Sequence, residues 1–311
     1  MKGAAREGEP SIDAQDVFTF RCGQGTEGMG VRSRWRQWGV SMAMCVSLSL
    51  PTLGQQRPLV TERVTTVPEG EMRLDVGFEF LQQLRFPLSG LQGDLSRMGV
   101  IGLSIGIAPR VEVQIRGTLQ NYLNVDEKRG GAIPLRLPTP QSTHDIGDFS
   151  LWTKIRLRAT GGRWPALGLR FGVELPNSNQ ARGIGTNQTN VFAAVLAEKS
   201  WETLDLFGHI GLGILPAPIE PFTQNDVLLY GAAGVYRVSD RVNLVAEVNG
   251  WANTRRVAPL GTESRGQARI GLQIRTGRVW WDLAGVRGLT AIDPRSGIAF
   301  GMSYTIPVWK Q

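Results

Sequence analysis

Cysteine, histidine and long apolar runs are scarce in this sequence. Of its 311 residues, two are cysteines (Cys22 and Cys45) and two are histidines (His144 and His209). A metal site built from cysteine and histidine at the usual spacings is therefore excluded. The hydrophobic content of 41 % is too low for a bundle of membrane-spanning helices. Whatever holds this chain together is neither a disulfide framework nor helix packing in a bilayer.

Concentrated positive charge is missing as well. The formal net charge is +7, but the basic residues are scattered singly along the chain rather than collected in runs. Nucleic-acid binding requires a basic patch or stripe. The sequence therefore predicts no nucleic-acid partner.

The N-terminal stretch has the three-part pattern of a secretory signal peptide. Three arginines come first: Arg32, Arg34 and Arg36. An apolar stretch from 38 to 50 follows, and Thr52 and Gly54 then supply the small residues of a cleavage site before Gln55. The alternative, a single membrane anchor, requires roughly 20 apolar residues, more than this stretch provides. Residues 1–54 are thus predicted to be an N-terminal extension plus a signal peptide, lost on secretion together with both cysteines.

From Glu71 onward the chain repeats one pattern, in which about ten residues alternate in polarity and a break follows. In "QARIGLQIR" at 267–275, Ala268, Ile270, Leu272 and Ile274 fall on one side of an extended chain, and Arg269 falls on the other. Strict alternation predicts a strand with one apolar and one polar face. About twelve such segments occur, each close to the roughly 9–11 residues that cross a bilayer when tilted.

The breaks between these segments alternate in length. Long breaks are expected at 82–96, 123–146, 176–188, 216–225, 253–264 and 289–297. Short ones are expected at 108–110, 160–163, 200–202, 239–241 and 276–278. An up-and-down barrel of the bacterial outer membrane has short turns at one rim and long loops at the other, whereas a soluble sandwich has no reason to alternate them. The sequence predicts an all-β, transmembrane antiparallel barrel of about 12 strands over residues 71–309.

Three further features accompany the predicted barrel. Residues 55–70 contain proline and threonine without any period, which predicts an extended periplasmic lead-in; whether it enters the lumen is open at this point. Tryptophans near strand ends suit the aromatic girdles of a membrane barrel: Trp164, Trp201, Trp251, Trp280, Trp281 and Trp309. The loop from 123 to 146 is the candidate plug or lid.

The polar faces of the strands predict a charged, wet lumen. The candidate lumen-lining residues are Arg73, Glu79, Lys154, Arg156, Arg170, Glu174, His209, Glu247, Arg269 and Arg275. Such residues pair across the lumen or meet water, and rings of charge also set which solutes pass a pore. A slight excess of arginine and lysine favours anions. The register between strands, and so the choice of partners, is not fixed by the sequence.

Three stretches resemble a known family: "RPLVTERVTTVPEG" before the first strand, "DIGDFSLWTKIRL", and "ALGLRFGVELPNSNQARGIGTNQTNVFAAVLAEKSW". They are similar to the MetA-pathway-of-phenol-degradation family of outer-membrane transporters, over most of residues 57–309. Asp145 stands where that family has the first glycine of its strand-opening motif. The resemblance implies passive passage of aromatic or hydrophobic compounds.

The predicted function is an outer-membrane channel or transporter for small solutes, with no enzymatic activity and no nucleotide or metal cofactor. The expected partners are outer-membrane lipid, small-molecule solutes and the barrel assembly machinery. Two alternatives stay open. A structural or loop-binding barrel conducts nothing, and a lipid-active barrel enzyme needs a nucleophile, a base and an orienting acid, for which Ser303, His209 and Asp205 are conceivable.

Overall fold

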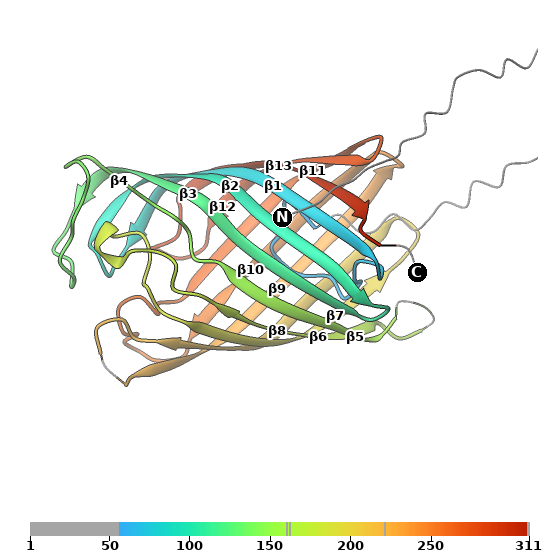
Figure 1. Ribbon diagram of the computed structural model, residues 1–311, viewed down its shortest axis with the longest axis horizontal. Helices are drawn as coiled ribbons and strands as arrows, with labels where there is room; N and C mark the ends of the chain where they lie inside the picture. Colours follow the sequence, from blue (N-terminus) through green and yellow to red (C-terminus); the bar gives the residue numbers. More distant parts are fainter. Residues whose placement is uncertain (1–55, 160, 162, 221, 310–311) are drawn as a thin grey trace, which may run out of the picture. The chain divides into compact units, whose positions relative to one another are not determined.

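The computed structural model describes residues 56–159, 161, 163–220 and 222–309, and Figure 1 shows its strands inclined around a common axis. The predicted signal peptide, its cleavage site and both cysteines lie outside the described residues. Among the described residues, no helix has the length and apolar character needed to cross a membrane.

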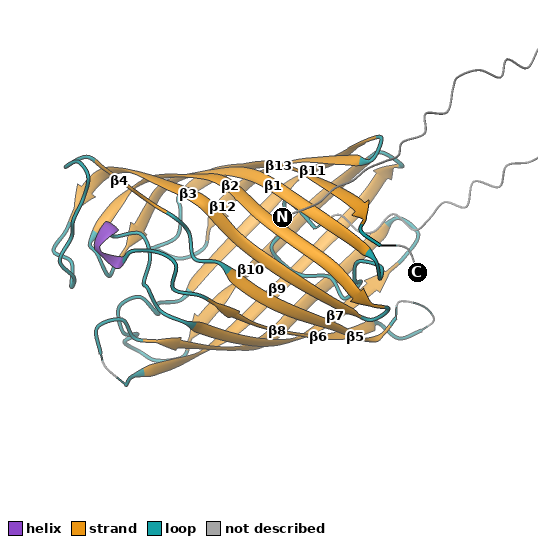
Figure 2. Ribbon diagram, viewed as in Figure 1, coloured by secondary structure: helices purple, strands orange, loops and turns teal. Residues whose placement is uncertain are grey.

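In the part of the chain that the structure describes, strands make up nearly all of the regular structure, and the one short helix is a 3-10 turn, η1 (Gln180–Arg182) (Figure 2). The strands are β1 (Glu71–Phe86), β2 (Leu91–Ala108), β3 (Val111–Lys128), β4 (Ser142–Asp145), β5 (Ser150–Arg158), β6 (Ala166–Glu174), β7 (Asn190–Ser200), β8 (Leu204–Pro216), β9 (Gln224–Ser239), β10 (Val242–Asn253), β11 (Arg265–Thr276), β12 (Val279–Gly288) and β13 (Ser296–Pro307). Neighbours in this order pair antiparallel, except that β3 pairs with both β4 and β5.

The sheet closes on itself because β1 also pairs with β13, from Glu71↔Pro307 to Gln82↔Ser296. Twelve strands form the closed wall, and the short β4 only lengthens it beyond β5 at the far end of β3. The prediction of an all-β, twelve-stranded antiparallel barrel is confirmed. Closure leaves no edge strand among the twelve described strands of the wall, which is what a β-structure needs in order to span lipid.

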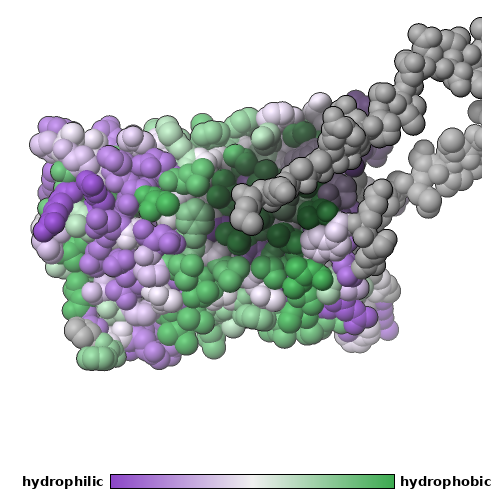
Figure 3. All heavy atoms as spheres, viewed as in Figure 1, coloured by the Kyte–Doolittle hydropathy of each residue, from purple (hydrophilic) through white to green (hydrophobic). Residues whose placement is uncertain are grey.

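Alternation sets the two faces of the wall. On β1, Phe78 is 52 % exposed on the outside, whereas Asp75 and Glu79 are 4 % and 5 % exposed inside. On β11, Ile270 is 71 % exposed outside and Arg269 is 6 % exposed inside. Figure 3 shows hydrophobic side chains gathered over the middle of the visible face, with hydrophilic ones toward its two ends. An apolar outer band and a polar interior are typical of a membrane barrel.

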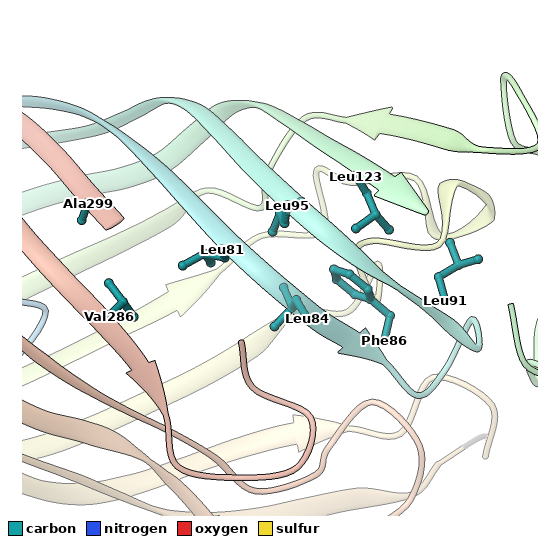
Figure 4. Close-up of a cluster of buried hydrophobic side chains, with 8 residues drawn as sticks. All are labelled: Leu81, Leu84, Phe86, Leu91, Leu95, Leu123, Val286 and Ala299. Atoms are coloured by element: carbon teal, nitrogen blue, oxygen red, sulfur yellow. The ribbon is translucent and has the colours of Figure 1, made fainter. Parts of the chain in front are cut away.

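The expected long break at 82–96 is instead a tight connection, because β1 and β2 continue to Phe86 and from Leu91. The reason is an apolar cluster inside the barrel mouth, formed by Leu81, Leu84, Phe86, Leu91, Leu95, Leu123, Val286 and Ala299 (Figure 4). Burial of these side chains stabilises strands beyond the length that the membrane requires. The polarity pattern there changes because the inward face becomes apolar.

The loop predicted at 123–146 is also shorter than expected. β3 runs on to Lys128 and pairs with β4, and Leu135 and Leu137 pack against the apolar cluster of the mouth. Nearby, Asn179 caps η1 by accepting a hydrogen bond from the Ala181 backbone. The loop that carries Leu135 and Leu137 covers part of the mouth, and a different segment fills the lumen.

The tryptophans divide between the two faces. Trp164 and Trp201 are 68 % and 51 % exposed, in keeping with a girdle. Trp251 instead packs inside against the cluster of Leu215, Val227 and Leu229. The Arg275 guanidinium lies 5.8 Å from the centre of the Trp280 ring. The girdle interpretation is therefore wrong for Trp251, because alternation along β10 turns it inward.

Candidate functional site: a lumen in two halves

The lumen is filled, near the short turns, by the chain's own residues 56–70, called here the lumen segment. Within it Thr61, Glu62 and Val64 are each 0 % exposed, and Arg63 is 7 % exposed. The wall residues that it contacts lie within a few positions of the short turns, at the start of β3 and β8 and the end of β11. The segment that the sequence predicts as a lead-in therefore lies inside the lumen.

Backbone N–H groups of the lumen segment donate to carboxylates of the wall. Val60 and Thr61 donate to Glu247, at 2.9 and 2.8 Å. Thr65 donates to Glu198 at 2.9 Å and Val67 to Glu112 at 2.7 Å. An irregular segment inside a barrel has no neighbouring strand whose carbonyl groups could accept hydrogen bonds from its N–H groups. The inward carboxylates accept these hydrogen bonds instead.

The side chains of the lumen segment add ion pairs with other strands. Arg57 lies 3.4 Å from Asp282 on β12. Arg63 pairs with Asp205 and lies 3.5 Å from Glu198. These contacts tie the segment to β7, β8 and β12, on widely separated parts of the wall. Removing one partner of such a buried pair would leave an uncompensated charge.

Glu62 has the most cationic surroundings in the lumen segment. It is paired with Arg116 and lies 3.1 Å from Lys154, whose side chain is itself buried. Burial acts to raise the pKa of the Glu62 carboxyl, but Arg116, Lys154 and Arg170 together hold that pKa well below its usual value. Glu62 therefore stays ionised and anchors the segment to β3 and β5.

Two glycines make room for the lumen segment. A Cβ atom on Gly301 would lie 2.5 Å from the Arg57 side chain, and one on Gly77 would lie even closer to it. The two glycines face each other across β1 and β13. Side chains at these positions would occupy the space of the Arg57 guanidinium, so glycine is required there for close approach.

The structure places the predicted lumen-lining residues in two groups. Arg73, Glu79, Lys154, Glu247 and Arg269 are buried within the barrel, between 1 % and 7 % exposed. Arg269 donates to Glu79 at 2.8 Å and to the Pro58 carbonyl at 3.2 Å. Most of these charges therefore hold one another or the lumen segment.

The other predicted residues are less buried or lie near one rim, although Arg170 is directly opposite Lys154. The Arg170 guanidinium stacks 3.7 Å from the centre of the Trp152 ring, while His209 lies against Gly231. Arg156 donates to the Pro109 carbonyl in a short turn. Arg156 and Arg275 thus belong to the short-turn rim, and Glu174 belongs to the opposite half of the lumen.

Above the lumen segment, toward the long loops, lies a cavity of about 480 Å³, called here the vestibule. Val60 of the lumen segment forms part of its lining. Its apolar lining includes Leu84, Phe86, Leu95, Phe192, Leu215 and Trp251. Sequence reasoning missed this chamber, because its walls come from β1, β2, β7, β8 and β10 together.

The polar lining of the vestibule contains seven charged residues: Arg97, Asp148, Glu174, Glu263, Arg265, Arg269 and Asp293. Arg97 and Arg269 are both paired with Glu79. The Arg265 side chain makes no hydrogen bond or ion pair with any described residue, although Asp293 and Glu263 attract it at longer range. The vestibule therefore holds at least one charged side chain that no described residue pairs.

The imagined catalytic set is engaged elsewhere. Ser303 donates to Asp75 on β1, and Asp205 is taken by Arg63 and Arg237. His209 is left with an Nδ1 atom that has no hydrogen-bond partner. Among the described residues, no group of three or more His, Cys, Asp or Glu side chains could hold a metal ion.

Comparisons with known proteins support the fold. No family model and no curated protein matches the chain, so membership of the family that it resembles stays a prediction. Among solved structures, the COG4313 outer membrane channel from Pseudomonas putida F1 is similar at 13 % identity and a TM-score of 0.57, covering 78 % of this chain and 98 % of that one. The NanC porin follows at 7 % identity and a TM-score of 0.46, covering 74 % and 98 %. At these identities the likeness is one of fold, that of bacterial outer-membrane barrels.

Proposed function

We propose that this protein is a channel of the bacterial outer membrane that passes small solutes, with a bore limited by its own lumen segment. The observation that carries the proposal is the vestibule, a cavity of about 480 Å³ inside a closed barrel and lined by both charged and apolar side chains. A protein with a purely structural role has no need of such a chamber, whereas a solute pathway requires one.

The apolar outer face supports a location in the outer membrane, and the likeness to the Pseudomonas putida channel supports the same kind of barrel. The family resemblance of the sequence favours aromatic or hydrophobic solutes. The vestibule suits them because Phe86, Phe192 and Trp251 offer aromatic surfaces beside polar groups. Passage is diffusion down a gradient.

Conductance across a planar bilayer tests the proposal, using the chain after removal of its leader. Small discrete current steps are expected, because the lumen segment leaves only a narrow path. Correctly folded protein that gives no steps, and whose segment-weakened variants also give none, would contradict a channel role. Loss of lipid hydrolysis in His209→Ala, measured in micelles, would favour the enzyme alternative instead.

A further inference from the structure

We infer that the vestibule binds a small organic cation, a protonated amine carried on an apolar body, with its charge held by Glu174, Asp148 and Asn121. This inference rests on the proposed channel function, since it names the class of solute that the pathway prefers. It begins from the charged side chains of the vestibule that form no ion pair with any described residue.

Glu174 and Asp148 lie side by side without a cationic partner. Glu174 ends β6 opposite Ser150, the first residue of β5, and Asp148 precedes that residue by two positions. Glu174 accepts from the Asn190 amide at 2.7 Å, and Asp148 accepts from Ser178. Neither carboxylate forms an ion pair with any described residue. Two neighbouring carboxylates in a half-buried wall favour a positive charge between them.

An independent observation marks the same wall. Asn121 on β3 is only 6 % exposed, lines the vestibule, and makes no side-chain hydrogen bond with the described residues. Its carbonyl oxygen is among the buried polar atoms without a partner. It lies beside the turn that carries Asp148, since Gly147 donates to the Thr118 carbonyl at 2.9 Å. A buried amide without a partner is costly unless a ligand or water satisfies it.

The other charged residues that line the vestibule also favour a cationic solute. Arg97 and Arg269 are both paired with Glu79, and Arg269 also lies 3.6 Å from Glu247. Among the charged lining residues, Arg265 is therefore the cation without an ion pair, against four lining carboxylates. Arg265 begins β11 and lies opposite Trp251 of β10, away from the wall formed by β3, β5 and β6. It would repel an ammonium group from its own side and toward Glu174. The site offers too few carboxylates for a bare metal ion, which requires six or more oxygen ligands if it is calcium.

The apolar body of the solute has a place nearby. Leu95 and Phe86 belong to the apolar cluster of the mouth, and Phe192 belongs to the cluster that includes Leu215. All four side chains line the vestibule. An aromatic face also attracts a cation directly, so Phe192 and Trp251 suit an amine better than an acid.

Titration calorimetry of the micelle-bound protein with 2-phenylethylamine, 2-phenylethanol and phenylacetate tests the inference, because these probes share a ring and differ in charge. The amine is expected to bind about tenfold more tightly than the acid, with the alcohol between them. Glu174→Gln combined with Asp148→Asn should reduce that preference to about twofold or less. Arg265→Gln should raise amine affinity, and Glu127→Gln, an exposed site outside the vestibule, should change nothing.

Equal binding of the three probes, or tighter binding of phenylacetate that Arg265→Gln abolishes, would overturn the inference. The Asn121→Leu variant provides a second test in case the carboxylate variants do not fold. It should weaken binding of the amine without changing the charge of the site. Bilayer recordings separate this result from the proposed function. Current steps without an amine preference would support the channel function and contradict the cation site. Amine binding without current steps would support the cation site and contradict the channel function.

Discussion

The two halves of the lumen treat their charges in opposite ways. In the half near the short turns, the lumen segment reaches Glu112, Glu198, Asp205, Glu247 and Asp282 with backbone N–H groups or arginines. In the half near the long loops, Glu263 and Asp293 form no ion pair with any described residue and each keeps one oxygen without a hydrogen-bond partner, and the Arg265 side chain is unpaired. The half near the short turns is therefore suited to hold a segment of the same chain, and the half near the long loops is suited to receive a solute.

Removing the anchor of the lumen segment should have the largest effect. Glu62→Ala leaves Lys154, which is 1 % exposed, without its carboxylate partner on the segment. Breaking a buried ion pair costs roughly 3–5 kcal/mol, enough to release the segment for much of the time. Bilayer conductance should rise severalfold. Glu69→Gln, in the same segment but without an ion pair, is the matched control, and an equal rise in both variants would contradict the anchoring role.

Filling the space of Arg57 should have a smaller effect of the same kind. Gly301→Val places a side chain where the Arg57 guanidinium lies and separates it from Asp282, and it also brings a Cβ to 2.7 Å from the Val76 carbonyl of β1. One end of the lumen segment is then displaced while Glu62 still holds the middle, so conductance should rise less than in Glu62→Ala. Gly285→Val is the control, because a Cβ there meets nothing closer than 4.0 Å. An equal rise of conductance in both variants would show that the effect arises in the wall and not from Arg57.

Weakening the vestibule should change stability and leave the lumen segment in place. Leu95 is 1 % exposed in the apolar cluster, so Leu95→Ala should lower the free energy of unfolding by roughly 2–5 kcal/mol. Urea unfolding in lipid vesicles measures the change. Leu119→Ala, at a side chain that is 52 % exposed on the outer face, should cost far less. An equal loss in the free energy of unfolding at both positions would show that the apolar cluster does not stabilise the barrel more than its outer face does.

A charge outside both halves should matter least. Arg129 and Glu127 form an ion pair at 2.8 Å, with side chains 59 % and 46 % exposed. An exposed pair contributes about 0–1 kcal/mol, so Arg129→Ala should leave unfolding and conductance nearly unchanged. A large shift in either measurement would show that the end of β3 takes part in the mouth of the channel.

The fold was predictable from the sequence because lipid forces a strict alternation on every strand. "QARIGLQIR" shows this alternation, and Ile270 and Arg269 lie on the faces that it assigns. The pattern failed at 82–96, where inward Leu84, Phe86 and Leu95 replace polar residues. There the constraint is packing inside the mouth, and that constraint has no period of its own.

The lumen segment was not predictable, because its partners are distant in sequence. Glu62 meets Lys154 and Arg116, and Arg63 meets Asp205, so no local pattern in residues 56–70 reports them. One signal was present: Glu62 and Arg63 are adjacent charges within residues 58–68, where every other residue is apolar, proline or threonine. Charges in such a segment require buried partners, and the inward charges of the strands could supply them.

The occupancy of the short-turn half is tested most directly by single cysteines in a chain with Cys22 and Cys45 replaced by serine. Val64 is 0 % exposed within the lumen segment, whereas Val60 is 43 % exposed and lines the vestibule. A hydrophilic maleimide applied to the protein in vesicles should label Val60→Cys and spare Val64→Cys, and Glu62→Ala should make the second site reactive. Equal, rapid labelling at both positions in the parent background would show that the segment does not occupy the lumen.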